Sequence, residues 1–353
     1  MKIFVEKTNE PKSKPSAEGL SFGTIFSDHM LICNYSPEMG WHNARITQYR
    51  DLSLSPSIMT IHYGQSIFEG LKAYKTADKK VNLFRPAENI RRLNISCKRL
   101  CIPQIDEKFG VEAIKALVDI DRDWIPEEYG TSLYIRPFIF ATDPYLGVRP
   151  SSTYMFVIIT GPVGAYYKEG INPVKIYVET KYVRAVVGGL GEVKASANYA
   201  ASLKAQVEAI EKGYTQVLWL DGIEKKYIEE VGTMNVFFVI DDEIVTPALT
   251  GSILPGITRK SAIELLKSWG YKVSERRITI DEVYEAHDKG MLKEVFGTGT
   301  AAVISPVGEL NRDGKIITIN NGEIGPVSQR LYDTITGIQY GRIPDKFGWI
   351  EQI

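Results

Sequence analysis

The chain has 353 residues, more than one hydrophobic core usually organises, so its length predicts two domains. Its 42 Lys and Arg residues nearly balance 43 Asp and Glu residues, which leaves a formal net charge of -1. That balance argues against nucleic acid or an anionic membrane as the main partner.

The cysteine and histidine content limits the kinds of site that the chain is predicted to contain. The three cysteines and four histidines show no spacing typical of metal ligands, so no metal site is predicted. An odd number of cysteines in a chain of this size indicates free thiols, which fit a reducing compartment. No run of about 18 apolar residues appears, and the first residues contain no long apolar segment. The sequence therefore predicts a cytoplasmic protein.

Apolar periodicity divides the first half of the chain into strands and helices. Apolar runs and alternation predict strands at 24–33, 58–63, 81–86, 133–140 and 154–160. Helical spacing predicts one helix from just beyond Pro86 to about Leu100 and another over 109–118. These elements form a small first domain over residues 1–161, which a Gly- and Pro-rich linker over 162–173 follows.

The second half, residues 174–353, reads as a larger domain of mixed α/β type. Strands are predicted at 174–179, 216–220, 227–230, 236–240 and 295–301. Helices are predicted over 198–212 and 259–269, and Thr279-Ile-Asp-Glu282 is a capping box that starts another. The chain is therefore predicted to be an α/β protein with a small α+β domain and a larger mixed domain.

Three glycine-containing stretches are candidates for holding an anion. Residues 251–258 resemble a nucleotide-phosphate loop, but Ile257 stands where that loop needs lysine, so a nucleoside triphosphatase is disfavoured. The backbone N–H groups at that helix start still suit a single phosphate. Thr298-Gly-Thr300 predicts a second nest of N–H groups. Gly188-Gly-Leu-Gly191 lacks the dinucleotide-binding pattern.

Lys194 stands between that last stretch and a predicted helix start. It is either solvated in a flexible loop or held close to a bulky group, because glycines let the backbone approach closely. A single phosphate and a constrained lysine together suggest pyridoxal 5'-phosphate, whose aldehyde condenses with a lysine amine. The ring nitrogen of that cofactor needs a carboxylate. Glu229 or Glu230 could supply it, since neighbours on a strand face opposite sides.

Seven short stretches spread over nearly the whole chain form a specific combination. They are Phe68-Glu-Gly-Leu-Lys, Leu83-Phe-Arg85-Pro, Tyr134-Ile-Arg136-Pro, Gly-Glu-Val-Lys194-Ala-Ser-Ala-Asn198-Tyr199, Glu230-Val-Gly-Thr-Met-Asn235, Ser-Ile-Leu-Pro-Gly-Ile-Thr-Arg259 and Gly299-Thr300-Ala301. In this order they resemble the branched-chain amino acid aminotransferases of fold type IV among pyridoxal-phosphate enzymes.

The resemblance implies a role for individual residues. Lys194 would hold the cofactor covalently and act as general acid and base, Glu230 would pair with the ring nitrogen, and Tyr199 would hydrogen-bond the ring hydroxyl. The Thr300-Ala301 turn would offer backbone donors to the substrate α-carboxylate. The phosphate would be held by Arg85, Ile257, Thr258 and Thr300. The side-chain pocket would be shaped by Tyr63, Phe68, Tyr166 and Thr233, with Tyr134 and Arg136 near it. The competing interpretations are plain core aromatics at Tyr63 and Phe68 and a helix cap at Arg85.

The implied activity is reversible transfer of the amino group of Leu, Ile or Val to 2-oxoglutarate, by a ping-pong route in a homodimer. The same pocket must accept glutamate, whose side-chain carboxylate is costly to bury unpaired, so Arg136 and the tyrosine hydroxyls are its hypothesised partners. The alternatives are a D-amino acid aminotransferase or an aminodeoxychorismate lyase of the same fold, or a non-catalytic protein that binds pyridoxal phosphate.

Overall fold

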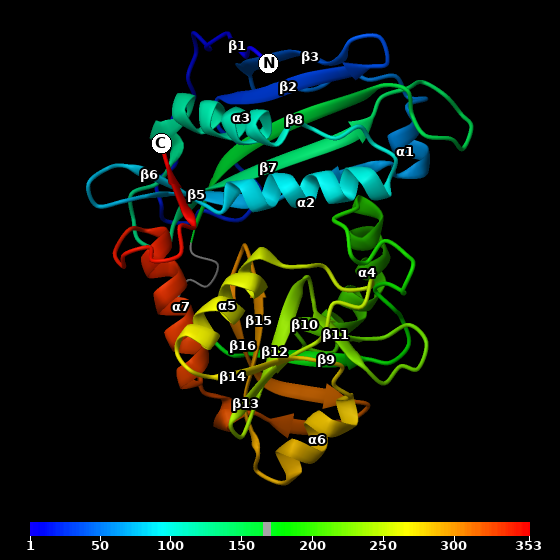
Figure 1. Cartoon of the computed structure of the whole chain (residues 1–353), viewed down its shortest axis with the longest axis vertical. Helices are drawn as coiled ribbons and strands as arrows, with labels where there is room; N and C mark the ends of the chain where they lie inside the picture. The colour runs from blue at the N-terminus through cyan, green and yellow to red at the C-terminus, as the bar shows by residue number, and fades with distance from the viewer. Residues whose placement is uncertain (165–170) are drawn as a thin grey trace. The chain divides into compact units, whose positions relative to one another are not determined.

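The computed structural model describes residues 1–164 and 171–353, and the chain divides into two compact units (Figure 1). The first unit comprises Met1–Lys168, Lys194–Ala197 and Gly337–Ile353. The second comprises Glu169–Val193 and Asn198–Thr336. The units are therefore discontinuous in sequence, whereas the sequence suggests one break around a linker at 162–173. Both units combine sheet and helix, and the predicted α/β class is confirmed.

A largely antiparallel sheet forms the body of the first unit. Its strands are hydrogen-bonded in the order β1, β3, β2, β8, β7, β5, β6, β18, and β4 pairs separately with β7. Their bounds are β1 (Phe4–Val5), β2 (His29–Ser36), β3 (Gly40–Gln48), β4 (Ser66–Phe68), β5 (Leu71–Lys75), β6 (Val81–Phe84), β7 (Ser132–Ala141), β8 (Tyr154–Val163) and β18 (Ile350–Gln352).

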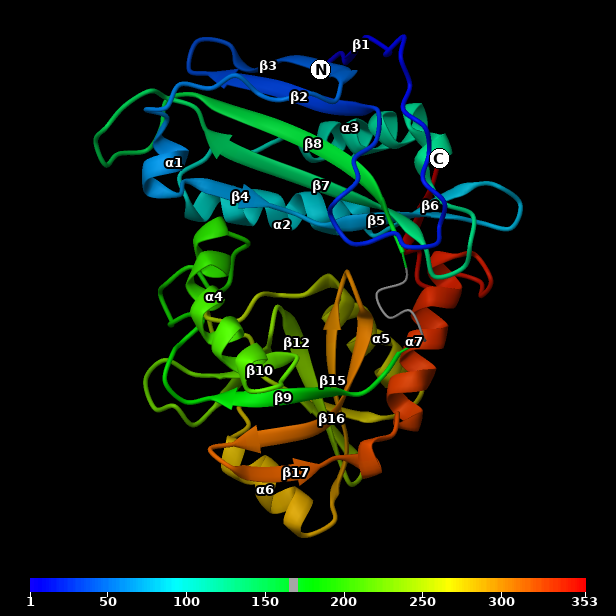
Figure 2. The same ribbon diagram turned by 180° about the vertical axis from the view of Figure 1, so that it is seen from behind.

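Two helices, α2 (Pro86–Arg99) and α3 (Glu107–Ile120), cover one face of this sheet, as Figure 1 and the reverse view in Figure 2 show. Both helices were predicted, and both are confirmed. Ile90 and Leu93 recur at helical spacing on α2 and are fully buried in the core cluster. Burying each such side chain contributes about 1.5–3 kcal/mol. The sequence pattern therefore fixes which face of α2 packs on the sheet.

One predicted strand is wrong. Residues 58–63 contain the short helix α1 (Met59–Tyr63), which Gly64 ends in the left-handed conformation with a φ of 64°. The N–H of Gly64 donates to the carbonyl of Thr60 at 3.0 Å and closes the last turn. A helix this short does not display a full helical period, so its apolar residues resemble a strand pattern.

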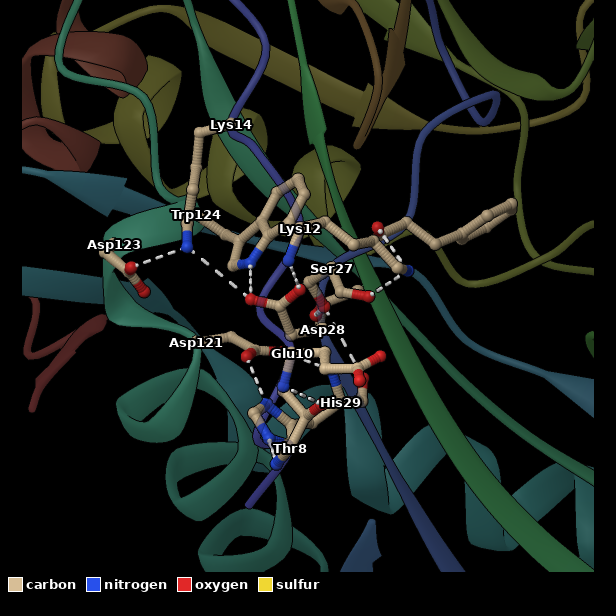
Figure 3. A network of polar contacts seen from close by, with 12 residues as sticks. Thr8, Glu10, Lys12, Lys14, Ser27, Asp28, His29, Asp121, Asp123 and Trp124 are labelled. Carbon is tan, nitrogen blue, oxygen red and sulfur yellow. Dashed lines mark hydrogen bonds and ion pairs between the residues drawn. The ribbon is translucent and has the colours of Figure 1, made fainter. Parts of the chain in front are cut away.

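A buried polar network ties the N-terminal segment to the sheet (Figure 3). The N–H of Lys12 donates to Oδ1 of Asp28 at 2.9 Å, and the N–H of Thr8 donates to Nε2 of His29 at 3.0 Å. His29 Nδ1 lies 2.7 Å from Oδ1 of Asp121. Because Nε2 accepts the hydrogen bond from Thr8, the imidazole proton belongs on Nδ1, facing the carboxylate. The segment before β2 is thus held by specific partners.

The second unit is built around another mixed sheet. Its order is β11, β10, β9, β16, β15, β12, β13, β14, with β17 beside β16 and an additional β11–β12 pairing that closes part of the path into a ring. The strands are β9 (Val174–Glu179), β10 (Gln216–Leu220), β11 (Ile228–Val231), β12 (Met234–Ile240), β13 (Glu243–Thr246), β14 (Lys272–Glu275), β15 (Leu292–Gly299), β16 (Val303–Arg312) and β17 (Lys315–Thr318).

The remaining helices are α4 (Ser196–Glu211), α5 (Ile257–Ser268), α6 (Ile280–Asp288) and α7 (Pro326–Gln339). The predicted capping box is confirmed, since the Thr279 hydroxyl accepts the N–H of Glu282 at 3.0 Å at the start of α6. The helix α7 was not predicted.

The cysteines are free thiols, as the sequence indicated. Burial raises the pKa of Cys33 to about 11 and that of Cys97 to about 12, so both are inert at neutral pH. Cys101 is exposed beyond the end of α2 and does not share the buried face of Cys97. In the described ranges, no group of three or more potential metal ligands occurs, and no helix is long and apolar enough to cross a membrane.

Candidate active site

Lys194 is held by the first unit in an extended segment. Its N–H donates to the hydroxyl of Ser96 at 3.0 Å, and its carbonyl accepts the N–H of Phe68 at 3.1 Å. The next residue, Ala195, forms an antiparallel bridge with Ile67 of β4. The flexible-loop interpretation is therefore wrong, because the backbone on either side of the lysine is paired with a strand and a helix.

The Lys194 side chain shares an aromatic ring with a second cation. Its Nζ lies 4.6 Å from the ring centroid of Phe68, and the guanidinium carbon of Arg136 lies at the same distance from that ring. Both distances are within the range in which cations are attracted to a π face. Phe68 is half-buried and contacts two predicted site residues, so it is not a plain core aromatic.

Arg136 and Tyr134 extend this group along β7. The Arg136 Nη2 donates to the Tyr134 hydroxyl at 2.9 Å. The Arg136 Nε is buried and has no hydrogen-bond partner among the described residues. A Cβ on Gly70 would lie 2.2 Å from the Tyr134 hydroxyl oxygen, so this phenol can occupy its place only beside a glycine. The structure thus presents a guanidinium with an unused buried donor.

A buried carboxylate that the sequence did not single out supports the lysine. Glu69 is fully buried, and its two oxygens accept from Nε and Nη2 of Arg92 at 2.8 and 2.9 Å. Asn89 adds a third donor at 2.8 Å. Burial by itself raises the pKa of Glu69, but the charge and hydrogen bonds of Arg92, aided by Lys194, bring it below its ordinary value. Glu69 is therefore an ionised group close enough to influence Lys194. In the sequence, the one signal for Glu69 is its position next to Phe68, a predicted pocket residue.

Arg85 and Tyr63 occupy other parts of the first unit. Arg85 stands at the N-cap of α2 with a φ of 51° and is buried, and its guanidinium carbon lies 5.2 Å from the ring centroid of Trp349. Its side chain makes no cap to the helix backbone, which disfavours the helix-cap interpretation. A non-glycine residue in the left-handed region is strained, and such strain is often found at functional sites. Tyr63 is exposed at the end of α1.

In the second unit, one cavity brings together Tyr199, Glu230 and Thr233. Glu230 is almost completely buried on β11. Its Oε1 accepts the N–H of Leu254 at 2.8 Å and lies 3.4 Å from Nη2 of Arg184. These two contacts fix the direction in which the carboxylate points.

The loop that leads to Tyr199 is tied down by Asn198. Its side-chain Nδ2 donates to the carbonyls of Leu190 at 2.7 Å and Val193 at 2.9 Å. The glycine-rich stretch is thereby folded back against the first turn of α4, which carries Tyr199 into the cavity.

Two backbone turns supply N–H groups in the second unit. Helix α5 begins at Ile257 and Thr258 without a side-chain cap, so its first N–H groups are not used by a cap. A Cβ on the preceding Gly256 would lie 2.0 Å from Asn235 Oδ1, so the loop packs against Asn235 too closely for any residue other than glycine. Thr300 and Ala301 form the turn between β15 and β16. Nearby, the buried hydroxyl of Thr298 has no hydrogen-bond partner among the described residues.

These residues fit pyridoxal 5'-phosphate. A buried carboxylate and a phenol line one cavity, an uncapped helix start offers donors for a phosphate, and a lysine amine is held by a rigid backbone. The predicted site residues thus fall into two groups, each within one unit: Phe68, Tyr134, Arg136 and Lys194, and Tyr199, Glu230 and Thr233. Tyr166 lies outside the described residues.

Comparison with known proteins agrees with this geometry. Residues 66–310 match the family model for amino-transferase class IV. Branched-chain-amino-acid aminotransferase 2 of Bacillus subtilis (strain 168) is 61% identical over 351 residues, which cover 99% of this chain and 97% of that protein.

Solved structures of branched-chain amino acid aminotransferases are similar in fold. The Escherichia coli enzyme is 30% identical, with a TM-score of 0.74 over 92% of this chain and 98% of its own. The T.th. enzyme with pyridoxamine 5'-phosphate is 32% identical, with a TM-score of 0.76 over 91% of this chain and 97% of its own. The chain therefore belongs to the class IV aminotransferases, and within them to the branched-chain amino acid aminotransferase family. The predicted family, the fold type and the cofactor, pyridoxal 5'-phosphate, are confirmed.

Proposed function

We propose that this protein reversibly transfers the amino group of Leu, Ile or Val to 2-oxoglutarate by a ping-pong route. Full-length similarity to a branched-chain-amino-acid aminotransferase supports the substrate class. The observation that carries the chemistry is Glu230, a buried carboxylate with fixed donors in the cavity that also contains Tyr199.

Pyridoxal phosphate, when bound, supplies an electron sink for the bond broken at the substrate Cα. Lys194 holds the cofactor through its amine and moves the proton at that carbon. Glu230 keeps the ring nitrogen protonated, because its charge favours a bound proton nearby. Tyr199 donates its hydroxyl proton to the ring oxygen.

The remaining residues bind and orient the cofactor phosphate and the substrate. Ile257 and Thr258 at the start of α5, with Thr300 and Arg85, hold the phosphate. The N–H groups of the Thr300-Ala301 turn bind the substrate α-carboxylate. Phe68 and Tyr134 in the first unit and Thr233 in the second are proposed to recognise the substrate side chain, and Tyr63 and Tyr166 keep the substrate-binding role predicted from the sequence.

The half-reaction tests this function. Adding L-leucine to the yellow holoenzyme, without an oxo acid, should bleach the cofactor absorbance and release one equivalent of the branched 2-oxo acid per site. D-leucine should leave the spectrum unchanged, which separates this activity from that of a D-amino acid aminotransferase. A spectrum that excess L-leucine does not alter would show that the protein only binds the cofactor.

Arg136 accounts for dual substrate recognition in this proposal. Its buried Nε has no partner among the described residues, while Nη2 is held by the Tyr134 hydroxyl, so the guanidinium is pre-oriented to bind a carboxylate. Arg136→Met should lower kcat/KM for glutamate about tenfold to a hundredfold, the usual effect of losing a charge-assisted hydrogen bond. The value for leucine should change much less.

The measurement is the ratio of kcat/KM for the two amino donors. Arg91→Met is a suitable control, because Arg91 is exposed and pairs with carboxylates at the surface of α2 and α3. An equal loss for glutamate and leucine in Arg136→Met would assign the guanidinium a structural role.

We also propose a cytoplasmic homodimer. The free thiols support a reducing compartment. Exposed apolar side chains at Tyr145, Leu146 and Val148, the last 87% exposed, support an interface between copies. Light scattering of the purified holoenzyme measures this assembly directly.

A further inference from the structure

The side chain of Arg184 lies where three segments of the second unit meet. It is 9% exposed and lines the same cavity as Glu230. Its Nη2 donates to the carbonyls of Ser252 and, at 3.3 Å, Gly191, and it lies 3.4 Å from Oε1 of Glu230. One guanidinium nitrogen therefore faces an acceptor from the glycine-rich stretch, another from the loop before α5 and a third from β11.

The glycine-rich stretch and the loop before α5 pack directly on each other beside this guanidinium. A Cβ on Gly191 would lie 2.1 Å from the Ser252 carbonyl oxygen, so this contact requires glycine. Ser252 is fully buried, and its hydroxyl donates to Oε1 of Glu229. Ser252 is thus held by its hydroxyl to β11 and by its carbonyl to Arg184. Removing the guanidinium takes a donor away from two backbone carbonyls, which is costly in a buried position.

A second path of contacts joins Glu230 to the same loop. The Oε1 that faces Arg184 also accepts the N–H of Leu254 at 2.8 Å. The carbonyl of Leu254 accepts Nδ2 of Asn235 at 2.9 Å, and Asn235 packs against Gly256, the N-cap of α5. The position of the Glu230 carboxylate and that of the start of α5 are therefore linked, so a shift of one is expected to move the other.

The guanidinium also carries the positive charge that acts on two neighbouring buried carboxylates. Glu229 and Glu230 are 5% and 3% exposed. Burial raises the pKa of Glu229 above its ordinary value, and the Ser252 hydrogen bond and the charge of Arg184 oppose that rise. An uncompensated buried charge is costly, so a neutral side chain cannot replace Arg184 without loss. A planar guanidinium holds several acceptors in fixed directions, whereas the ammonium of lysine is a compact point charge.

We propose that Arg184 is a positioning residue for the cofactor, because it fixes the Glu230 carboxylate relative to the start of α5. One molecule of pyridoxal phosphate can then be bound by its ring nitrogen and by its phosphate together. This inference rests on the proposed function, in which Glu230 binds the ring nitrogen and the first N–H groups of α5 bind the phosphate.

Equilibrium binding of pyridoxamine 5'-phosphate to the full chain freed of cofactor tests the proposal. This form of the cofactor has no aldehyde, so its affinity depends on neither a bond to Lys194 nor turnover. Arg184→Met should weaken its binding at least about tenfold, as expected for loss of charge-assisted hydrogen bonds. Arg184→Lys restores the charge without the planar fork, so it should bind the cofactor more tightly than the methionine variant and at least about threefold more weakly than the unmodified protein.

A double substitution separates positioning from a general effect on the fold. If Arg184 acts through Glu230, Arg184→Met should cost less affinity in a protein that already carries Glu230→Gln. The difference should be at least about threefold, as contacting residues are not additive. Thermal unfolding of each cofactor-free variant shows whether it is folded at the temperature of the titration.

The outcomes are distinct. Arg277→Met is the control: its guanidinium is 52% exposed and pairs with Glu224 in the same unit, so the variant should bind pyridoxamine 5'-phosphate like the unmodified protein. If Arg184→Met does not fold, Arg184→Lys carries the test, since it keeps a cation beside the buried carboxylates. Unchanged affinity in a folded Arg184 variant, or an equal loss with and without Glu230→Gln, would overturn the proposal. Failure of the proposed function would differ, because the unmodified protein would then bind the cofactor without reacting with L-leucine.

Discussion

Lys194→Ala is expected to abolish transamination while leaving the protein folded. Loss of a positioned general acid and base by itself lowers the rate about 10²–10⁴-fold, and loss of the covalent link to the cofactor adds to this. The backbone at this position stays paired, because the contacts to Ser96 and Phe68 use the N–H and carbonyl of the residue and not its side chain. Steady-state kinetics with leucine and 2-oxoglutarate measure the loss, and thermal unfolding measures the fold.

Two further variants sharpen this result. Lys194→Arg keeps the cation near Phe68 but cannot condense with an aldehyde, so it should be as inactive as the alanine variant. Lys204→Ala removes a surface lysine that pairs with Glu208 on α4 at 3.3 Å, an exposed pair worth little, and should leave kcat unchanged. Substantial turnover by Lys194→Ala would remove Lys194 from the mechanism.

Glu230→Gln is expected to lower kcat about 10²-fold or more, as removal of one preorganised electrostatic group typically does. Glutamine matches glutamate in size, so the cavity with Tyr199 keeps its shape. The substitution removes the negative charge that, in the proposed function, would keep the ring nitrogen protonated. Arg184, 3.4 Å from the Glu230 carboxylate, also loses its counterion. Single-turnover rates with leucine measure the chemical step without interference from product release.

Glu230→Asp tests separately the charge of the carboxylate and its exact position. It restores the carboxylate with a shorter reach, so it should be faster than the glutamine variant and slower than the unmodified protein. The glutamine variant should unfold at a lower temperature than the other two proteins, because the buried guanidinium of Arg184 loses its counterion. A glutamine variant with an unaltered single-turnover rate would show that Glu230 does not act on the ring nitrogen.

The elements that follow from local chemistry could be predicted from the sequence. Helix α2 follows from Pro86 at its first position and from Ile90 and Leu93 at helical spacing. The start of α6 follows from the capping box at Thr279. The strand β9 has the predicted bounds, Val174–Glu179. In each case the signal lies within a few residues of the element it determines. The ordered motifs from Phe68 to Ala301 likewise determined the family and the cofactor.

The tertiary structure alone decided how these residues are held. Ser96 and Phe68, each about a hundred residues or more before Lys194, convert an apparent loop into a paired segment. The Glu69–Arg92 ion pair and the unused Nε of Arg136 also depend on contacts between separate elements. The residue pattern alone left Glu229 and Glu230 as alternatives, and the structure places Glu230 in the cavity that Tyr199 and Thr233 also line. Local sequence specifies which groups are present, and only long-range packing decides which donor meets which acceptor.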